Sequence, residues 1–239
     1  MLIQANELSY RDINDRLRSG GRESTLLGCL GQRFIGAGMA GLSVTVEGIP
    51  GNALGAYLNG ASITVRGNAQ DAVGDTMNDG EITIHGSVGD AAGYAMRGGS
   101  IFIQGDAGYR TGIHMKEYRE KVPIIVIGGT TGSFLGEYQA GGVIVVLGLG
   151  RGKRSIVGPF PCTGMHGGKL ILRSDGSDLT FPDQVTARAA DAGDLEQIEK
   201  YVREYCSRFG TDVDEVMNHP FTVVTPDSRN PYKQLYVAN

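Results

Sequence analysis

The chain has 239 residues, a formal net charge of −4 and no tryptophan, and this charge argues against a nucleic-acid surface, which needs a basic field. Hydrophobic residues make up 41% of the chain in regular runs and only eight prolines occur, which excludes disorder and a collagen helix. The three cysteines lie far apart, and no apolar stretch is long enough to span a bilayer. We therefore expect a reduced, cytoplasmic protein without disulfides.

A helix is predicted near the start of the chain. In "ELSYRDINDRLRSGG", Tyr10, Ile13 and Leu17 recur at helical spacing, and Gly20 is a plausible stop. We assign residues 1–24 to a helical cap, because the repeat that follows leaves an open end to be covered.

The segment "GAGMAG" at residues 36–41 has the glycine spacing of the dinucleotide-binding fingerprint. That fingerprint binds a pyrophosphate only where a helix follows the glycines. Here "LSVTVEG" follows, whose alternation predicts a strand, and no acidic residue stands about twenty positions downstream. The glycines therefore need an explanation other than NAD binding.

The glycines recur at a period of nineteen residues. One ladder comprises Gly36, Gly55, Gly74, Gly93 and Gly112, a second comprises Gly48, Gly67, Gly86 and Gly105, and Gly129 and Gly148 resume the step after an insertion. A fixed period of this length marks a repeat architecture. Glycine suits the corners of such a coil, because it accepts positive φ cheaply and lets two chain levels stack closely.

A short strand ends at the ladder glycine of each repeat. Two apolar residues stand four and two places before that glycine, so both point to one face of the strand, while the intervening threonines point outward. The pairs are Val44/Val46, Ile63/Val65, Ile82/Ile84, Ile101/Ile103, Ile125/Ile127, Ile144/Val146 and Leu170/Leu172, and a second apolar column is Met39, Leu58, Met77, Met96 and Met115. We predict an all-β fold, a single-stranded β-helix of about seven turns over residues 25–182, whose stacked repeats bury one apolar tube.

Two insertions interrupt the period, at residues 114–123 and 148–161. Insertions in a solenoid bulge out as loops, often on a binding face. We predict that both loops contribute to one basic and aromatic patch that contacts a partner. Its residues are Arg110, Lys116, Tyr118, Arg119, Arg151, Lys153 and Arg154. The alternative is that the loops are solvated and leave the coil on opposite sides.

The sequence shows no catalytic or metal-binding constellation. Cys162 stands where other repeats place glycine, and we expect a small buried thiol, since no base is visibly paired with it. The four histidines occupy different repeat positions, so we expect neither a metal site nor a Ser/His/Asp triad. An active site would need a cleft joining Cys162, His114 and His166. We expect no metal, no cofactor and no catalysis from this chain alone.

Residues 183–239 are predicted to form helices and an extended tail. The segment "DAGDLEQIEKYVREYCSRFG" predicts an amphipathic helix that covers the far end of the coil and ends at Gly210. Its apolar face comprises Leu195, Ile198, Val202, Tyr205 and Phe209. Thr211 with Asp214 predicts a capping box for a further helix. The prolines of "HPFTVVTPDSRNPYKQLYV" predict a tail that runs over a surface, either of its own domain or of a partner.

As a set, "LGQRFIGAGMAG", "AMRGGSIFIQG", "GYRTGIHM" and "GSFLGEYQAGGVIVVLGLG" resemble the Gly-x-Gly-x-Gly domain of glutamate synthase. "TGMHGG" and "HPFTVV…SRNPY" are similar to the free-standing form of this domain, which archaea and some bacteria encode as a separate subunit. The resemblance covers residues 3–236. It implies a right-handed β-helix.

The resemblance also implies a non-catalytic scaffold subunit of glutamate synthase, which makes two glutamates from glutamine and 2-oxoglutarate. The implied partners are a glutamine amidotransferase subunit and a synthase subunit that carries FMN and an iron–sulfur cluster, and a homo-oligomer is also open. Nucleic acid and membrane are not expected partners. The same β-helix occurs in the C subunit of formylmethanofuran dehydrogenase and in N-methylglutamate synthase, and these are the alternatives.

Overall fold

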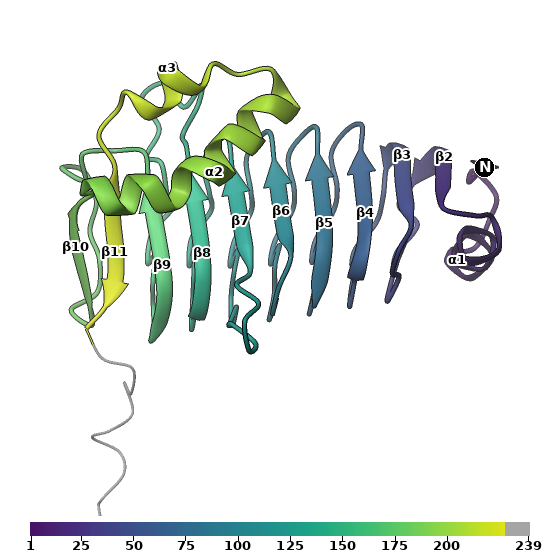
Figure 1. Cartoon of the computed structure of the whole chain (residues 1–239), viewed down its shortest axis with the longest axis horizontal. Coiled ribbons are helices and arrows are strands. Elements are labelled where there is room, and N and C mark those ends of the chain that lie inside the picture. Colours follow the sequence, from purple (N-terminus) through teal and green to yellow (C-terminus); the bar gives the residue numbers. More distant parts are fainter. Residues whose placement is uncertain (228–239) are drawn as a thin grey trace, which may run out of the picture.

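The computed structural model describes residues 1–227, which wind into one long coil with a helix near each end (Figure 1). The elements, in chain order, are β1 (Leu2–Gln4), α1 (Tyr10–Ser19), β2 (Glu23–Leu30), β3 (Ser43–Ile49), β4 (Asn59–Val65), β5 (Asp79–Ile84), β6 (Ser100–Ile103), β7 (Ile124–Ile127), β8 (Ala140–Val146), β9 (Gly167–Leu172), β10 (Val185–Ala189), α2 (Ala192–Phe209), α3 (Val213–Met217) and β11 (Thr222–Pro226). None of the helices in residues 1–227 is long and apolar enough to cross a membrane. Most of the predicted tail, residues 228–239, lies outside the described residues.

The coil is the β-helix that the 19-residue period predicts. Strands β1 to β9 pair in parallel with their neighbours in chain order, and the sheet then continues with β11 and β10 in antiparallel pairing. Ile82 of β5 stands opposite Ile63 of β4 and Ile101 of β6, so equivalent repeat positions stack. A second line of parallel bridges joins Ala69, Val88, Ala107, Thr131 and Val157 on another side of the coil.

Strand β2 adds a turn before the first apolar pair of the sequence pattern. Ser24 of β2 stands opposite Val44 of β3, and Leu26 stands opposite Val46. Ser24 is buried like the valine beside it. The inward position that is apolar in the later strands is therefore a serine here, so the apolar pattern of the sequence did not reveal this strand.

Inward side chains fill the coil. Ile82, Ile84, Ile101 and Ile103 are 0% exposed, as the alternation predicts. The apolar column at steps of 19 is buried as well, through Met39, Leu58, Met77, Met96 and Met115. Burying one such side chain contributes about 1.5–3 kcal/mol, so these stacked columns hold successive turns together.

The two glycine ladders have different physical causes. Gly74 has φ +69°, and a Cβ there would lie 2.6 Å from Cδ1 of Ile101, two strands further along the chain. Gly86 needs no positive φ, but its Cβ would lie 2.7 Å from the carbonyl oxygen of Gly67 in the preceding turn. Gly74 of the first ladder therefore needs glycine for φ and for room, and Gly86 of the second for the close stacking of chain levels. Cys162 occupies the first-ladder position at φ +61° in the last turn, where no further parallel strand follows β9 to crowd its Cβ.

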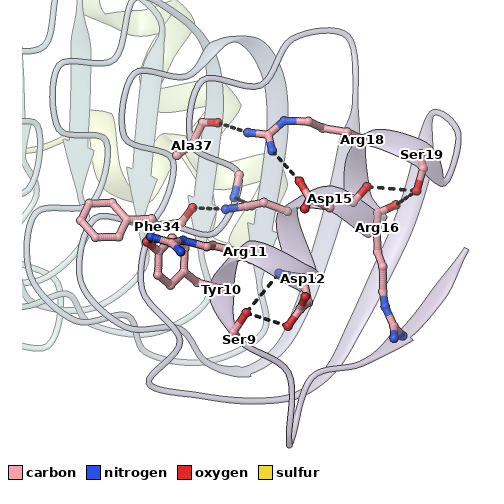
Figure 2. Close-up of polar contacts among 12 residues, drawn as sticks. Ser9, Tyr10, Arg11, Asp12, Asp15, Arg16, Arg18, Ser19, Phe34 and Ala37 are labelled. Carbon is pink, nitrogen blue, oxygen red and sulfur yellow. Dashed lines mark hydrogen bonds and ion pairs between the residues drawn. The ribbon is translucent and has the colours of Figure 1, made fainter.

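The predicted helix near the start of the chain is present as α1 and lies against the first turns of the coil (Figure 1). It begins after Ser9, whose side chain accepts a hydrogen bond from the N–H of Asp12, and it buries Ile13 and Leu17 in the main core. Figure 2 shows the polar contacts along this helix, including the Arg18 guanidinium that reaches towards a backbone carbonyl of the coil. The helix thus attaches through both an apolar face and polar contacts.

Helix α2 lies across the outer face of the sheet, and the expectation that it covers the far end of the coil is wrong (Figure 1). Its side chains, including Ile198 and Tyr205, pack on outward-pointing side chains such as Phe102 and Val126 in a second hydrophobic cluster. Strands β7 to β9 carry apolar residues on both faces, which is typical of strands buried on both sides. At the far end, β11 and β10 continue the sheet instead.

The ends of α2 and α3 are capped by neighbouring side chains and backbone. A capping box at Asp191 starts α2, and Gly210 ends it in the left-handed conformation at φ +68°, as predicted. The predicted capping box of Thr211 with Asp214 is wrong, because Asp212 is the N-cap of α3. The Asp212 carboxylate accepts hydrogen bonds from two N–H groups of the first turn, which are the donors that a cap must satisfy.

Candidate binding surface

The three thiols of the chain are buried. Burial raises the pKa of Cys162 to about 12 and that of Cys29 to about 11, and it also raises the pKa of Cys206. A reactive cysteine needs a lowered pKa and access to solvent. Cys162 is therefore the small buried thiol that the sequence predicts.

The histidines of the coil lie in separate surroundings. Arg66 Nη1 lies 2.8 Å from Nε2 of His85, and burial together with the Arg66 charge lowers the pKa of this histidine. Cys162 is 0% exposed, whereas an active site formed with His114 or His166 would need it to face an open cleft. Within residues 1–227, no group of three or more His, Cys, Asp or Glu side chains could hold a metal ion.

Aromatic side chains that are exposed or half-buried gather along the corners of the coil. The rings of His114 and Tyr138 stack with 5.2 Å between centroids, and the ring of Tyr94 meets His114 edge-on at 5.9 Å. The Arg110 guanidinium lies 5.1 Å from the centroid of the Phe134 ring. These contacts form because each turn returns the chain to the same corner. We name these five residues the aromatic ridge.

The ridge residues stand on unusual backbone that the whole coil shares. His114 and Phe134 have φ +56° and +62°. The same corners carry Ala91 and Ala95 in an earlier turn, at φ +57° and +50°. Positive φ is therefore a property of the coil geometry, and what distinguishes the later turns is the size and chemistry of the side chains.

An ion pair orients the arginine of the ridge. Nε of Arg110 lies 2.8 Å from Oε2 of Glu137, and the two side chains are 51% and 11% exposed. A pair this open to water contributes no more than about 1 kcal/mol to stability. Its effect is to fix the guanidinium over Phe134 while leaving half of the arginine side chain exposed for a partner.

The two insertions leave the sheet at opposite ends of its strands, so the single patch predicted from the sequence is not formed. The first insertion, residues 114–123, directly precedes β7, and the second, 148–161, follows β8. Because β7 and β8 are parallel neighbours, one loop lies at the amino ends of the strands and the other at the carboxyl ends. The two loops are close along the coil axis, because β7 and β8 are neighbours, but their positions around the coil keep them apart.

The first insertion folds back on earlier turns. A bridge between Tyr118 and Lys121 closes it, and Lys121 Nζ lies 2.7 Å from Oδ2 of Asp79. The hydrogen bond from Lys121 holds the pKa of Asp79 below its ordinary value. The Arg119 guanidinium lies 5.2 Å from the centroid of the Tyr118 ring, and Lys116 is exposed.

Two of the basic side chains of the second insertion form ion pairs within the chain. Arg154 pairs with Asp106 at 3.0 Å, and Arg151 lies 3.7 Å from Asp178, whereas Lys153 is exposed. Burial raises the pKa of Asp106, but hydrogen bonds from Thr130 in the following turn and from Arg154 lower it further, so the pKa stays below its ordinary value. Arg151 and Arg154 therefore order this loop.

An apolar pocket of about 500 Å³ opens at the far end of the coil. Its walls come from the second insertion and from the segment before β10, and they include Val157, Pro159, Phe160, Pro161, Leu179, Phe181 and Pro182. Phe160 stacks on Phe134 of the ridge with 5.3 Å between centroids and is 65% exposed. We name this feature the end pocket.

The GXGXG motif family profile matches residues 9–227. The chain belongs to this family. An uncharacterized protein of Methanocaldococcus jannaschii is 40% identical over 253 aligned positions, which cover 100% of this chain and 97% of that protein. The GXGXG profile spans nearly the whole coil together with α1, α2 and β11.

A solved structure has a similar fold. The formyltransferase/hydrolase complex (FhcABCD) of Methylorubrum extorquens, determined with methylofuran, contains a chain that superposes with a TM-score of 0.62. The match covers 85% of this GXGXG chain and 72% of that chain, at 24% sequence identity. At this identity the likeness shows the fold.

Arg110 is the one residue of the aromatic ridge that the sequence predicts as a partner contact. A sequence signal was present for His114, which stands at steps of 19 from Tyr57, Thr76 and Ala95, whereas the positive φ that these four residues share is visible only in the structure. This column marks a corner whose side chain faces outward. The end pocket had no such signal, because its walls, 155–163 and 178–182, meet only in the folded chain.

Proposed function

We propose that this GXGXG protein is a scaffold subunit of a multi-subunit enzyme complex. The observation that supports it is the contrast between the inside of the coil and its corners. Inside, the coil is filled and Cys162 is buried with a raised pKa, while the ridge exposes Tyr94, Arg110 and His114 beside two half-buried aromatic rings. Aromatic and arginine side chains are those that most often anchor protein interfaces. Such a molecule offers surfaces for partners.

The complex we propose is glutamate synthase. The chain would hold a glutamine amidotransferase subunit and a synthase subunit in register, and FMN and the iron–sulfur cluster would belong to the synthase subunit. The resemblance of the repeat motifs to the glutamate synthase domain supports this choice. The fold likeness to the formyltransferase/hydrolase complex supports the alternative, a role like that of the C subunit of formylmethanofuran dehydrogenase. N-methylglutamate synthase is the further alternative.

Co-purification distinguishes these complexes. The tagged full chain is co-expressed either with the amidotransferase and synthase subunits or with formyltransferase/hydrolase subunits from the same cell. We expect a stable complex with the first set, and glutamine-dependent glutamate formation that rises when the chain is added. Assembly with the second set alone would contradict the glutamate synthase proposal, and assembly with neither would contradict the scaffold role.

Surface variants locate the contact. We expect Arg110→Ala with Phe134→Ser to weaken assembly by about thirtyfold or more, the effect of losing an interface anchor worth about 2 kcal/mol. The matched control is Tyr57→Ser, an aromatic residue that is 58% exposed at an equivalent corner of an earlier turn. Circular dichroism checks that each variant is folded. Equal weakening by the control would remove the ridge as the contact.

The insertion residues remain proposed partner contacts, now as two separate surfaces. Tyr118→Ala tests the loop at the amino ends of the strands, and Arg154→Ala tests the loop at the carboxyl ends. Because the loops lie apart, their effects on the free energy of assembly should add in the double variant. Undiminished assembly in the double variant would leave both loops without this role.

A further inference from the structure

The end pocket is an open apolar cleft in the part of the chain that the structure describes. Its volume of about 500 Å³ lies within the range of clefts that bind ligands and peptide side chains. Phe160, on its wall, is 65% exposed, and Leu179 and Phe181 are only partly buried against the main core. An apolar surface of this kind is costly to leave in contact with water.

The described chain ends at the rim of this pocket. The N–H of Asp227 donates a hydrogen bond of 3.0 Å to the carbonyl oxygen of Gln184, which lies two residues after the pocket residue Pro182. The Gln184 side chain in turn donates to the carbonyl oxygen of Cys162 at 3.4 Å, between the pocket residues Pro161 and Thr163. Residues 228–239 therefore start next to the cleft.

The composition of residues 228–239 matches the pocket. The segment reads "SRNPYKQLYVAN" and carries four large apolar or aromatic residues, Tyr232, Leu235, Tyr236 and Val237. A chain of this length reaches at most about 40 Å when extended, far more than the pocket requires. Its two charged side chains are basic, Arg229 and Lys233. The Asp183 carboxylate next to the pocket is exposed, and the Asp178 side chain in its wall is 51% exposed although it lies 3.7 Å from Arg151.

We propose that residues 228–239 dock in the end pocket of their own chain, with their aromatic side chains against Phe160. The segment would then cover the apolar wall that the end pocket exposes at this end of the coil. Docking within one chain is favoured because the segment is tethered at the rim, which gives it a high effective concentration there.

The absence of tryptophan from the chain allows a single fluorescent reporter. In Phe160→Trp, excited selectively, we expect blue-shifted emission and weak quenching by acrylamide, because the docked segment covers the indole. Adding Tyr232→Ser, Leu235→Ser and Tyr236→Ser in the full chain should shift the emission to the red and strengthen quenching. A peptide of sequence 228–239 should reverse both changes.

The matched control is Phe34→Trp, at the equivalent corner of the first turn, where the native side chain is 43% exposed. Its emission should not respond to the serine substitutions. Hydrogen exchange of residues 178–185, compared between the native chain and the triple serine variant without the reporter, gives a second measurement that does not alter the pocket. Unchanged emission and unchanged exchange in the serine variant would overturn the proposal. Emission that depends on protein concentration would also overturn it, because a second copy would then fill the pocket.

Discussion

Replacing Gly74 by alanine tests whether the first glycine ladder needs glycine both for positive φ and for room. The residue has φ +69°, and a Cβ would lie 2.6 Å from Cδ1 of Ile101. Left-handed backbone costs alanine about 1–2 kcal/mol. Overpacking of a filled core adds about 1–3 kcal/mol. We therefore expect Gly74→Ala to lower the free energy of unfolding by about 2–5 kcal/mol.

Two further variants separate the two costs. Gly38 has nearly the same φ, +67°, but nothing lies within 4 Å of its Cβ position, so Gly38→Ala should cost only the backbone part, about 1–2 kcal/mol. Ile101→Val removes the Cδ1 atom that the alanine would meet and costs about 0.5–1.5 kcal/mol by itself. The Gly74→Ala/Ile101→Val double variant should be more stable than the sum of the single effects predicts, by about 1–2 kcal/mol.

Equilibrium unfolding in urea, followed by circular dichroism, measures the native chain and the four variants. Equal m values make the midpoints comparable as stabilities. If Gly38→Ala and Gly74→Ala cost the same and the double variant is additive, crowding by Ile101 has no energetic effect. The ladder would then reflect backbone conformation alone.

Three further predictions concern the outer helix, acid stability and the thiols. Arg208 forms a bidentate ion pair with Glu81 at 2.7 and 2.6 Å. We expect Arg208→Ala to lower the free energy of unfolding by about 1.5–3 kcal/mol and to raise hydrogen exchange in the last turns of α2. Unchanged exchange there would contradict this. The hydrogen bond from Arg188, opposed by burial, holds the pKa of Asp194 at about 2, below the ordinary 3.8. Because the pKa of Asp194 is lower in the folded state than in the unfolded state, its stabilisation is complete above about pH 4 and is lost as the pH falls towards 2. The free energy of unfolding, measured against pH, should fall less steeply over this range in Asp194→Asn. Since Cys162 and the other two cysteines are buried, a thiol reagent such as DTNB should titrate none of them in the native chain and three in urea, and a fast native reaction would refute their burial.

The sequence by itself determined the coil. Outside the two insertions, its repeats place each inward isoleucine, methionine and ladder glycine 19 residues from the next, and in a β-helix those are the residues that touch. The contacts that form the core are therefore nearest-neighbour contacts between equivalent positions, and a periodicity can reveal them. Helices α1 and α2 were predictable for a similar reason, because helical spacing and a glycine stop are local signals.

Only the tertiary structure decided where the remaining parts lie. Arg208 meets Glu81, 127 residues earlier, and places α2 on the outer face of the sheet. The insertions divide between opposite ends of the strands, so Tyr118 and Arg154 face different surroundings. Of the candidate surface, the sequence predicts Arg110 and the insertion residues as partner contacts, but neither the rest of the ridge nor the end pocket. The physical reason is that these features depend on pairs of segments far apart in the chain with no shared period, and their packing is settled only when the folded coil brings them together.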